Sequence, residues 1–143
     1  MDKEKLVGTW RLVSWENRDE NGNISHPLGS DAKGYISYTV DGHVFVHIMA
    51  GNRKEFSTEG LFDVTPTECV QAYTTHISYC GPYEIDGQTI VHKVEVCSYP
   101  NWIGSVQRRH AVFKDGKLTL SAKGIRVDAG KVDAYLVWEP FER

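Results

Sequence analysis

The chain contains 143 residues, the size of one domain around one hydrophobic core, so a single domain over residues 1–143 is expected. Hydrophobic residues make up 41% and charged residues 24% of the sequence, which excludes disordered, collagen-like and disulfide-scaffold proteins. The formal net charge is −3 and no basic run is longer than Arg108-Arg109, so a nucleic-acid partner is not expected.

The N-terminus and the cysteines indicate the cellular compartment of the protein. The charged residues 1–5 are not followed by the apolar core of a secretion signal, and no later segment approaches the length of a membrane span. Cys69, Cys80 and Cys97 are odd in number and show no CxxC spacing, which favours a reducing compartment. We therefore expect a cytoplasmic protein with no membrane partner. The sequence leaves a monomer and a homodimer open.

Runs rich in Val, Ile, Tyr, Phe and Thr recur along the chain, separated by short turn sequences. Three of the turns are Asp-Gly dipeptides, at 41–42, 86–87 and 115–116, and this dipeptide is a strong signal of a β-hairpin. Because closure removes exposed sheet edges, the sequence predicts a mainly-β fold, a single antiparallel barrel of about 8–10 strands. The expected strands occupy residues 7–17, 34–40, 43–50, 79–85, 88–98, 105–114, 117–123, 124–128 and 131–139.

One helix interrupts the strands. Thr65-Pro66-Thr67-Glu68 is a capping-box sequence with proline at the first helical position, and Val70, Tyr73 and Ile77 follow at helical spacing. The sequence predicts a short helix over about residues 66–76. Because the connection 51–78 is much longer than a hairpin turn, we expect this helix to cover a barrel end as a gate. A helix packed on the outside of the barrel is the alternative.

The hairpin turns also predict which side chains share a face of the sheet. The expected cross-strand pairs are Tyr83 with Ile90, Phe113 with Leu118, and His92 with Ala111. One face of these strands is mainly apolar and is assigned to the interior. It carries Tyr79, Tyr83, Ile90, His92, Val94, Val96, Gln107, Arg109, Ala111, Phe113, Leu118 and Leu120.

The first hairpin is less decisive, because both of its faces contain apolar residues. A two-residue turn at 41–42 groups Tyr38 with His47, and we assign this face to the interior. The full face comprises Ile36, Tyr38, Val40, Phe45, His47 and Met49. In the last strand the expected inward residues are Val132, Ala134, Leu136 and Trp138.

Several motifs, spread over nearly the whole chain, carry a family resemblance. They are Gly8-Thr9-Trp10-Arg11-Leu12-Val13-Ser14, Pro27-Leu28-Gly29, Asp31-Ala32-Lys33-Gly34-Tyr35, Tyr38-Thr39 with Asp41-Gly42, Gly81-Pro82-Tyr83-Glu84, His92-Lys93-Val94-Glu95 and Pro100-Asn101-Trp102-Ile103-Gly104. In combination they resemble the bacterial and fungal lipocalin-like domain family, a relative of the lipocalin and fatty-acid-binding barrels (calycins). The resemblance implies a lipocalin-like β-barrel around a cavity for a small, largely apolar molecule. It implies no shared catalytic motif.

The interior polar residues are the candidate ligand contacts. An inward Arg109 has no carboxylate on the neighbouring strands, so it either finds a structural hydrogen-bond partner or meets a polar or anionic ligand group. Trp102 lies in a loop between strands, where an aromatic ring either rims a cavity mouth or joins the core. The candidate ligand-binding set is Tyr38, His47, Tyr83, His92, Trp102 and Arg109.

Two functions are compatible with these residues. The first is a carrier that binds a small hydrophobic or amphipathic molecule. The alternative is a cofactor-independent isomerase, cyclase or lyase acting on a polyketide- or terpenoid-like metabolite, with His92, Tyr83 and Arg109 as candidate catalytic residues. No metal is expected, because the six histidines show neither HxH nor HExxH spacing. No cofactor is expected either, since phosphate-binding loops and nucleotide fingerprints are missing from the sequence.

Overall fold

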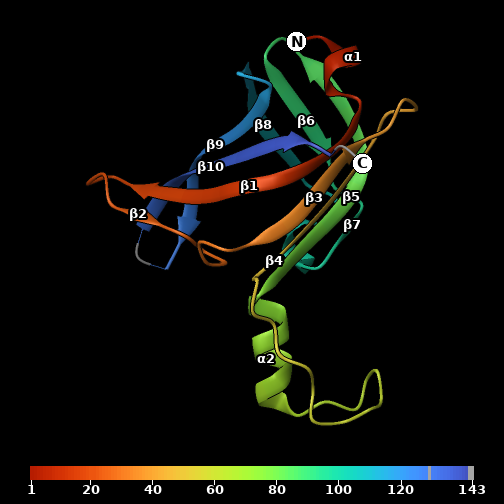
Figure 1. Cartoon of the computed structure of the whole chain (residues 1–143), viewed down its shortest axis with the longest axis vertical. Coiled ribbons are helices and arrows are strands. Elements are labelled where there is room, and N and C mark those ends of the chain that lie inside the picture. The colour runs from red at the N-terminus through yellow and green to blue at the C-terminus, as the bar shows by residue number, and fades with distance from the viewer. Residues whose placement is uncertain (129, 142–143) are drawn as a thin grey trace.

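The computed structural model describes residues 1–128 and 130–141. Strands account for 54% and helices for 11% of the described residues, so the predicted mainly-β class is confirmed. Within the described residues, eight antiparallel strands form a closed barrel and two short strands lie outside it (Figure 1). The barrel strands, in spatial order, are β10 (Gly130–Pro140), β9 (Lys117–Val127), β8 (Val106–Lys114), β6 (Thr89–Lys93), β5 (His76–Asp86), β4 (His43–Met49), β3 (Lys33–Tyr38) and β1 (Gly8–Asp19).

Pairing between the first and last barrel strands closes the sheet, with Leu12 opposite Trp138. The outer strands are β2 (Ile24–Ser25), beside β1, and β7 (Val96–Cys97), beside β5. The expected strand at 88–98 is therefore divided into β6 and β7, and Val96 is 65% exposed rather than interior. The expected strands at 117–123 and 124–128 form one strand, β9.

The hairpin registers show how far turn sequences fix pairing. At 115–116 both Asp115 and Gly116 have positive φ, as a two-residue hairpin turn requires, and the predicted pair of Phe113 with Leu118 is confirmed. Between β5 and β6, Tyr83 lies opposite His92 instead of Ile90, and between β6 and β8, His92 lies opposite Gln107 instead of Ala111. These shifts of two and four residues leave the predicted interior faces unchanged, because side chains alternate with a period of two.

The first hairpin differs by one residue, which reverses a face. Thr39 bonds directly to His43, so residues 40–42 form a three-residue loop with Gly42 at positive φ. Tyr38 therefore lies opposite Val44, and the inward residues of β4 are Val44, Val46 and Ile48. The expectation that Phe45, His47 and Met49 face the interior is wrong, since all three side chains are exposed on the outside of the barrel.

The helix α2 (Pro66–Thr74) forms at the predicted place. Thr65 and Glu68 make both hydrogen bonds of the capping box, and Pro66 occupies the first turn. The helix does not cover a barrel mouth, however. It projects away from the barrel (Figure 1), and Val70 and Tyr73 are 62% and 50% exposed. The gate expectation is therefore wrong, and the helix is not packed along the outside of the barrel either.

The helix that lies at a barrel end is α1 (Lys3–Leu6), which is not among the predicted elements (Figure 1). Asp2 caps its N-terminus by accepting a hydrogen bond from the backbone of Glu4. Leu6 is fully buried in the core, and its carbonyl accepts a hydrogen bond of 2.9 Å from the indole nitrogen of Trp10. Trp10 in turn packs against Phe113. These contacts seal this end of the barrel.

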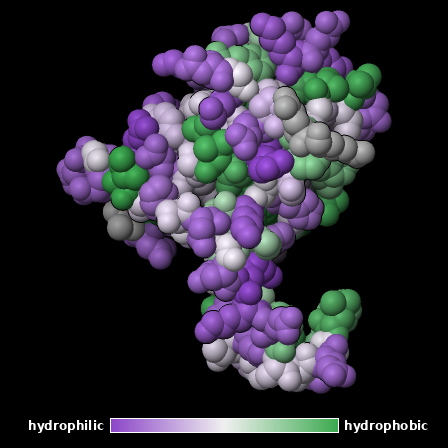
Figure 2. Space-filling model, in the orientation of Figure 1, coloured by the Kyte–Doolittle hydropathy of each residue, from purple (hydrophilic) through white to green (hydrophobic). Residues whose placement is uncertain are grey.

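The segment 51–65 packs along α2, and together they form a protrusion that we call the α2 appendage, residues 51–75. Figure 2 shows apolar surface at its free end, where Leu61 and Phe62 are 80% and 91% exposed. Arg53 bonds to the last turn of α2 and Ser57 bonds to Glu68 in its first turn. The helix thus finds its polar partners in its own loop rather than on the barrel.

Candidate functional site

The barrel encloses a cavity of about 280 Å³. Most of its lining is aliphatic or aromatic, contributed by strands from all around the barrel. The main apolar lining residues are Ile36, Val46, Ile48, Ile77, Leu120, Ala134, Leu136 and Trp138. Such a concave, mainly apolar space with a few polar groups is typical of small-molecule sites.

The polar centre of the cavity is His92, which is 1% exposed. Its Nε2 lies 2.7 Å from the hydroxyl oxygen of Tyr38, and its Nδ1 lies 2.7 Å from that of Tyr79. The three residues come from three different strands, β6, β3 and β5. Both ring nitrogens are therefore occupied by tyrosine hydroxyls. Tyr79 and His92 line the cavity, whereas Tyr38 lies behind the imidazole.

Burial determines the charge of this centre. Desolvation, helped by the nearby Arg109 guanidinium, lowers the pKa of His92 from 6.5 to about 3. Desolvation also raises the pKa of Tyr79, and it raises the pKa of Tyr38 well above its usual value. The imidazole and both phenols are consequently neutral at physiological pH.

Arg109 lines the cavity from β8. Its guanidinium donates to the backbone oxygen of Arg108 at 3.1 Å and lies 5.8 Å from the ring centroid of Trp102. Within the part of the chain that the structure describes, no Asp or Glu oxygen lies within ion-pair distance of it. The charge next to the cavity is therefore stabilised by a backbone carbonyl and an aromatic face.

Two lining residues, Trp15 and Asn17, were missed by the sequence reading. Trp10 and Leu12 point inward with simple alternation, but a β-bulge between Leu12 and Ser14 shifts the pattern by one residue. Trp15 and Asn17 then face the cavity, and the Trp15 indole nitrogen donates to Asn17 Oδ1 at 3.1 Å. Leu12 follows Trp10 by two residues, whereas Trp15 follows Leu12 by three. This longer step is the sequence signal that could have predicted the bulge and the inward position of Trp15 and Asn17.

Trp138 contributes an unusual polar atom. Its side chain is 1% exposed and lines the cavity. Its Nε1 is buried and has no hydrogen-bond partner among the described residues. Buried donors are nearly always paired in folded proteins, so this atom requires an explanation.

The structure brings together only part of the predicted ligand-binding set. His92, Arg109 and Trp102 line the cavity, and Trp102 stands at the half-exposed rim in the 3-10 turn η1 (Pro100–Trp102). Tyr38 reaches the site through its hydrogen bond to His92. Tyr83 does not line the cavity, because its hydroxyl donates to the backbone oxygen of Thr39.

His47 lies outside the barrel, with its ring centroid 5.7 Å from that of His76. Its expected inward position was wrong because of the one-residue change in the first hairpin. No cluster of three or more metal-ligating side chains occurs among the described residues. Within the same residues, no helix has the length and apolar character needed to cross a membrane.

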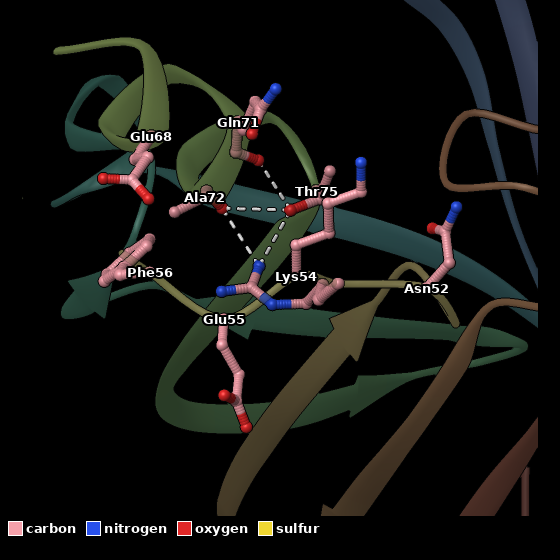
Figure 3. A pocket seen from close by; sticks show the side chains of 9 residues that line it. Asn52, Lys54, Glu55, Phe56, Glu68, Gln71, Ala72 and Thr75 are labelled. Atoms are coloured by element: carbon pink, nitrogen blue, oxygen red, sulfur yellow. Dashed lines mark hydrogen bonds between the residues drawn. The ribbon is translucent and has the colours of Figure 1, made fainter. Parts of the chain in front are cut away.

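A second hollow of about 310 Å³ lies in the α2 appendage, between residues 52–56 and the helix (Figure 3). The Arg53 side chain lies across this hollow. Its Nη1 donates to the carbonyl of Ala72 and to the hydroxyl of Thr75, both at 3.0 Å. These bonds satisfy groups at the C-terminal end of α2. We therefore assign this hollow a structural role in holding the loop against the helix.

A protein-family model described as a lipocalin-like domain matches residues 7–140 of the chain. The protein belongs to the lipocalin-like domain family. The resemblance expected from the sequence motifs is thus confirmed, and the closed eight-stranded barrel agrees with it.

Among curated proteins, this lipocalin-like chain is similar to the 4'-hydroxy-3'-methoxypropiophenone carrier protein ppsC of Aspergillus oryzae. The two are 30% identical over 105 residues, which are 67% of this chain and 95% of the relative. The carrier name of this relative and the shared family support a binding-protein role.

Two solved structures are also similar over nearly the whole chain. An uncharacterized protein from Bacteroides eggerthii is 13% identical with a TM-score of 0.48, covering 95% of this chain and 99% of that one. A mutant of the fluorescent protein UnaG is 18% identical with a TM-score of 0.43, covering 97% and 98%.

Proposed function

We propose that the protein is a carrier that binds one small, largely apolar molecule in the barrel cavity, with the polar end of the molecule at Arg109 and His92. The observation that carries this proposal is the lining of the cavity. Apolar side chains form most of it, while Arg109, Tyr79 and His92 form one polar region. A guanidinium beside an apolar cavity, with no carboxylate partner among the described residues, suits a ligand that supplies an oxygen.

The size of the cavity narrows the ligand class. About 280 Å³ lies just below the range of roughly 300–1,000 Å³ found for sites of drug-sized ligands. A molecule with one ring and a short substituent suits this volume better than a long fatty acid or a fused polycycle. The ppsC relative is named as the carrier of a single-ring aryl ketone, which supports the same class of ligand.

Trp102 is the proposed rim contact. Its ring lies between Tyr79, at a centroid distance of 5.9 Å, and Arg109, at 5.8 Å from the guanidinium. Its side chain is half-buried, so it borders both the cavity and solvent. A ligand entering at this rim would pass an aromatic face before reaching Arg109.

The alternative function, a cofactor-independent isomerase, cyclase or lyase, has weaker support. A general base works best when its pKa lies near the operating pH. The pKa of His92 is about 3, and both of its ring nitrogens already bond to tyrosines. This imidazole is a poor proton acceptor for an enolisable substrate. Tyr83, a second catalytic candidate, bonds to Thr39 away from the cavity.

Binding can be tested with a panel of single-ring and short-chain compounds, fatty acids and terpenoids, read by tryptophan fluorescence and by the melting temperature. A bound ligand stabilises the native state by mass action, so single-ring compounds should raise the melting temperature most. Product analysis after prolonged incubation separates the two functions, since a carrier returns each compound unchanged. Turnover of any panel compound would favour the enzyme.

A cavity-filling variant locates the binding site. Ala134 is buried and lines the cavity, so Ala134→Phe should reduce affinity at least about tenfold by occupying the ligand volume. Val112→Phe, on the exposed outer face of β8, is the matched control and should bind normally. If Ala134→Phe does not fold, Leu136→Trp makes the same test. Unchanged affinity in a folded cavity variant would contradict binding inside the barrel.

A further inference from the structure

Some hydrogen-bonding groups of the cavity residues already have a partner within the chain, and others do not. Trp138 lines the cavity, is buried, and has an Nε1–H group without an acceptor among the described residues. This nitrogen has almost no accessible surface, so Trp138 presents its apolar ring rather than its N–H group to the cavity. The donor for a ligand must therefore come from another lining residue.

The chain of hydrogen bonds from Tyr38 through His92 to Tyr79 provides that donor. A neutral imidazole has one N–H and one lone pair, so one tyrosine donates to His92 and the other accepts from it. The Tyr38 hydroxyl is fully buried, and within the described structure its partner is His92 Nε2. If Tyr38 accepted from the ring, its own proton would have no acceptor, which buried hydroxyls avoid.

This count of donors and acceptors favours one direction for the two hydrogen bonds of His92. Tyr38 donates to Nε2, and His92 Nδ1–H donates to the oxygen of Tyr79. The hydroxyl proton of Tyr79 is then not used within the chain. Tyr79 lines the cavity, so this proton is available to a ligand. The buried chain of three residues thereby fixes which way Tyr79 donates.

The other polar lining groups point to the same chemistry. Arg109 carries only donors, and its guanidinium lies beside the cavity. The carbonyl oxygen of Asn17 already accepts one hydrogen bond, from the Trp15 indole. The polar region of the cavity therefore presents mainly donors, the Tyr79 hydroxyl and the Arg109 guanidinium.

From this arrangement we infer that the ligand is a small apolar molecule with an oxygen acceptor, a carbonyl or carboxylate compound, held by the Tyr79 hydroxyl with Arg109 beside it. The inference rests on the proposed carrier function and specifies its ligand chemistry. An amine or other donor-rich ligand is disfavoured, because it would face the same donors and a positive charge.

A matched series of single-ring probes tests the inference. Acetophenone, phenylacetate, ethylbenzene and benzylamine are similar in size and differ in one group. One good hydrogen bond corresponds to about a tenfold change in affinity, so acetophenone or phenylacetate should bind at least tenfold more tightly than ethylbenzene. Benzylamine should bind most weakly. A preference for phenylacetate over acetophenone identifies an anionic acceptor, and the reverse identifies a neutral carbonyl.

Tyr79→Phe removes the hydroxyl and keeps the ring. We expect the ratio of acetophenone to ethylbenzene affinity to fall about tenfold in this variant. A ratio within one variant is insensitive to general loosening of the barrel, which changes both affinities. Tyr83→Phe is the matched control, because the Tyr83 hydroxyl bonds to Thr39 away from the cavity. It should leave the ratio unchanged.

The outcomes separate the two proposals. If none of the four probes binds at millimolar concentration and the wider panel is also inactive, the carrier function itself fails. If ethylbenzene binds as tightly as acetophenone and phenylacetate, or benzylamine binds best, the cavity is a binding site but the acceptor inference is overturned. Tighter binding of the oxygen compounds, lost in Tyr79→Phe and kept in Tyr83→Phe, supports it.

Discussion

Acidification should destabilise this protein through His92, and the structure sets both the direction and the size of the effect. The folded-state pKa of His92 is about 3, against 6.5 for an unperturbed histidine. Between these values the unfolded chain binds a proton at this residue and the native chain does not. The free energy of unfolding is therefore highest above pH 6.5 and decreases as the pH falls toward 3.

The magnitude follows from the distance between the two pKa values. Each pH unit inside this window lowers the free energy of unfolding by about 1.4 kcal/mol. From pH 7.5 to pH 5 the expected loss from His92 alone is about 2 kcal/mol, because little is lost above pH 6.5. This is a large part of the roughly 5–15 kcal/mol that stabilises a typical domain.

Urea denaturation at several pH values measures the effect. His92→Gln removes the titrating group and keeps a side chain that can donate and accept hydrogen bonds. Between pH 7.5 and pH 5 the free energy of unfolding of this variant should therefore fall by about 2 kcal/mol less than that of the wild type. His76→Gln is the control, because His76 is only half-buried and its pKa is lowered less severely. If His92→Gln is too unstable to measure, NMR titration of the wild-type imidazole should show no protonation at pH 5. An unchanged pH dependence in the variant, or protonation near pH 6, would refute the reasoning.

Two further predictions concern the fold. A Cβ at Gly81 would collide with the carbonyl oxygen of Lys93, so Gly81→Ala should cost about 3 kcal/mol or more. Gly87→Ala meets open space at positive φ and should cost only about 1–2 kcal/mol, and equal urea midpoints for the two variants would contradict this explanation. Thr65→Ala removes the cap of α2, worth about 1 kcal/mol, so hydrogen exchange over residues 66–74 should accelerate about fivefold. The melting temperature of the barrel should stay the same, and a matching decrease would show that the α2 appendage is coupled to the barrel.

The candidate site was predictable in part because strand faces follow from alternation. Arg109 and His92 lie on the inward face of strands whose outward face is charged, and both line the cavity. The hydrogen-bond chain around His92 was not predictable. Tyr38 and Tyr79 precede His92 by 54 and 13 residues, and the pairing and curvature of the sheet from β3 to β6 bring the two tyrosine hydroxyls onto the ring nitrogens of His92.

The sequence by itself determined the features that depend on local chemistry. The Asp115-Gly116 turn adopts the positive φ values that its residues favour, and it sets its hairpin register. The capping box at Thr65 begins α2 where expected. Alternation assigned the interior faces of β8, β9 and β10, because a register shift of an even number of residues keeps each side chain on its face.

Only the tertiary structure decided the features that depend on one extra residue or on distant partners. One additional loop residue at 40–42 moved His47 to the outside, and one bulge after Leu12 turned Trp15 into the cavity. Strict two-residue alternation assigns the wrong face to every side chain beyond such a step, because one extra residue exchanges the two faces of the strand. The placement of α2 likewise depended on Arg53 and Glu68, whose hydrogen bonds hold the helix to its own loop instead of the barrel mouth.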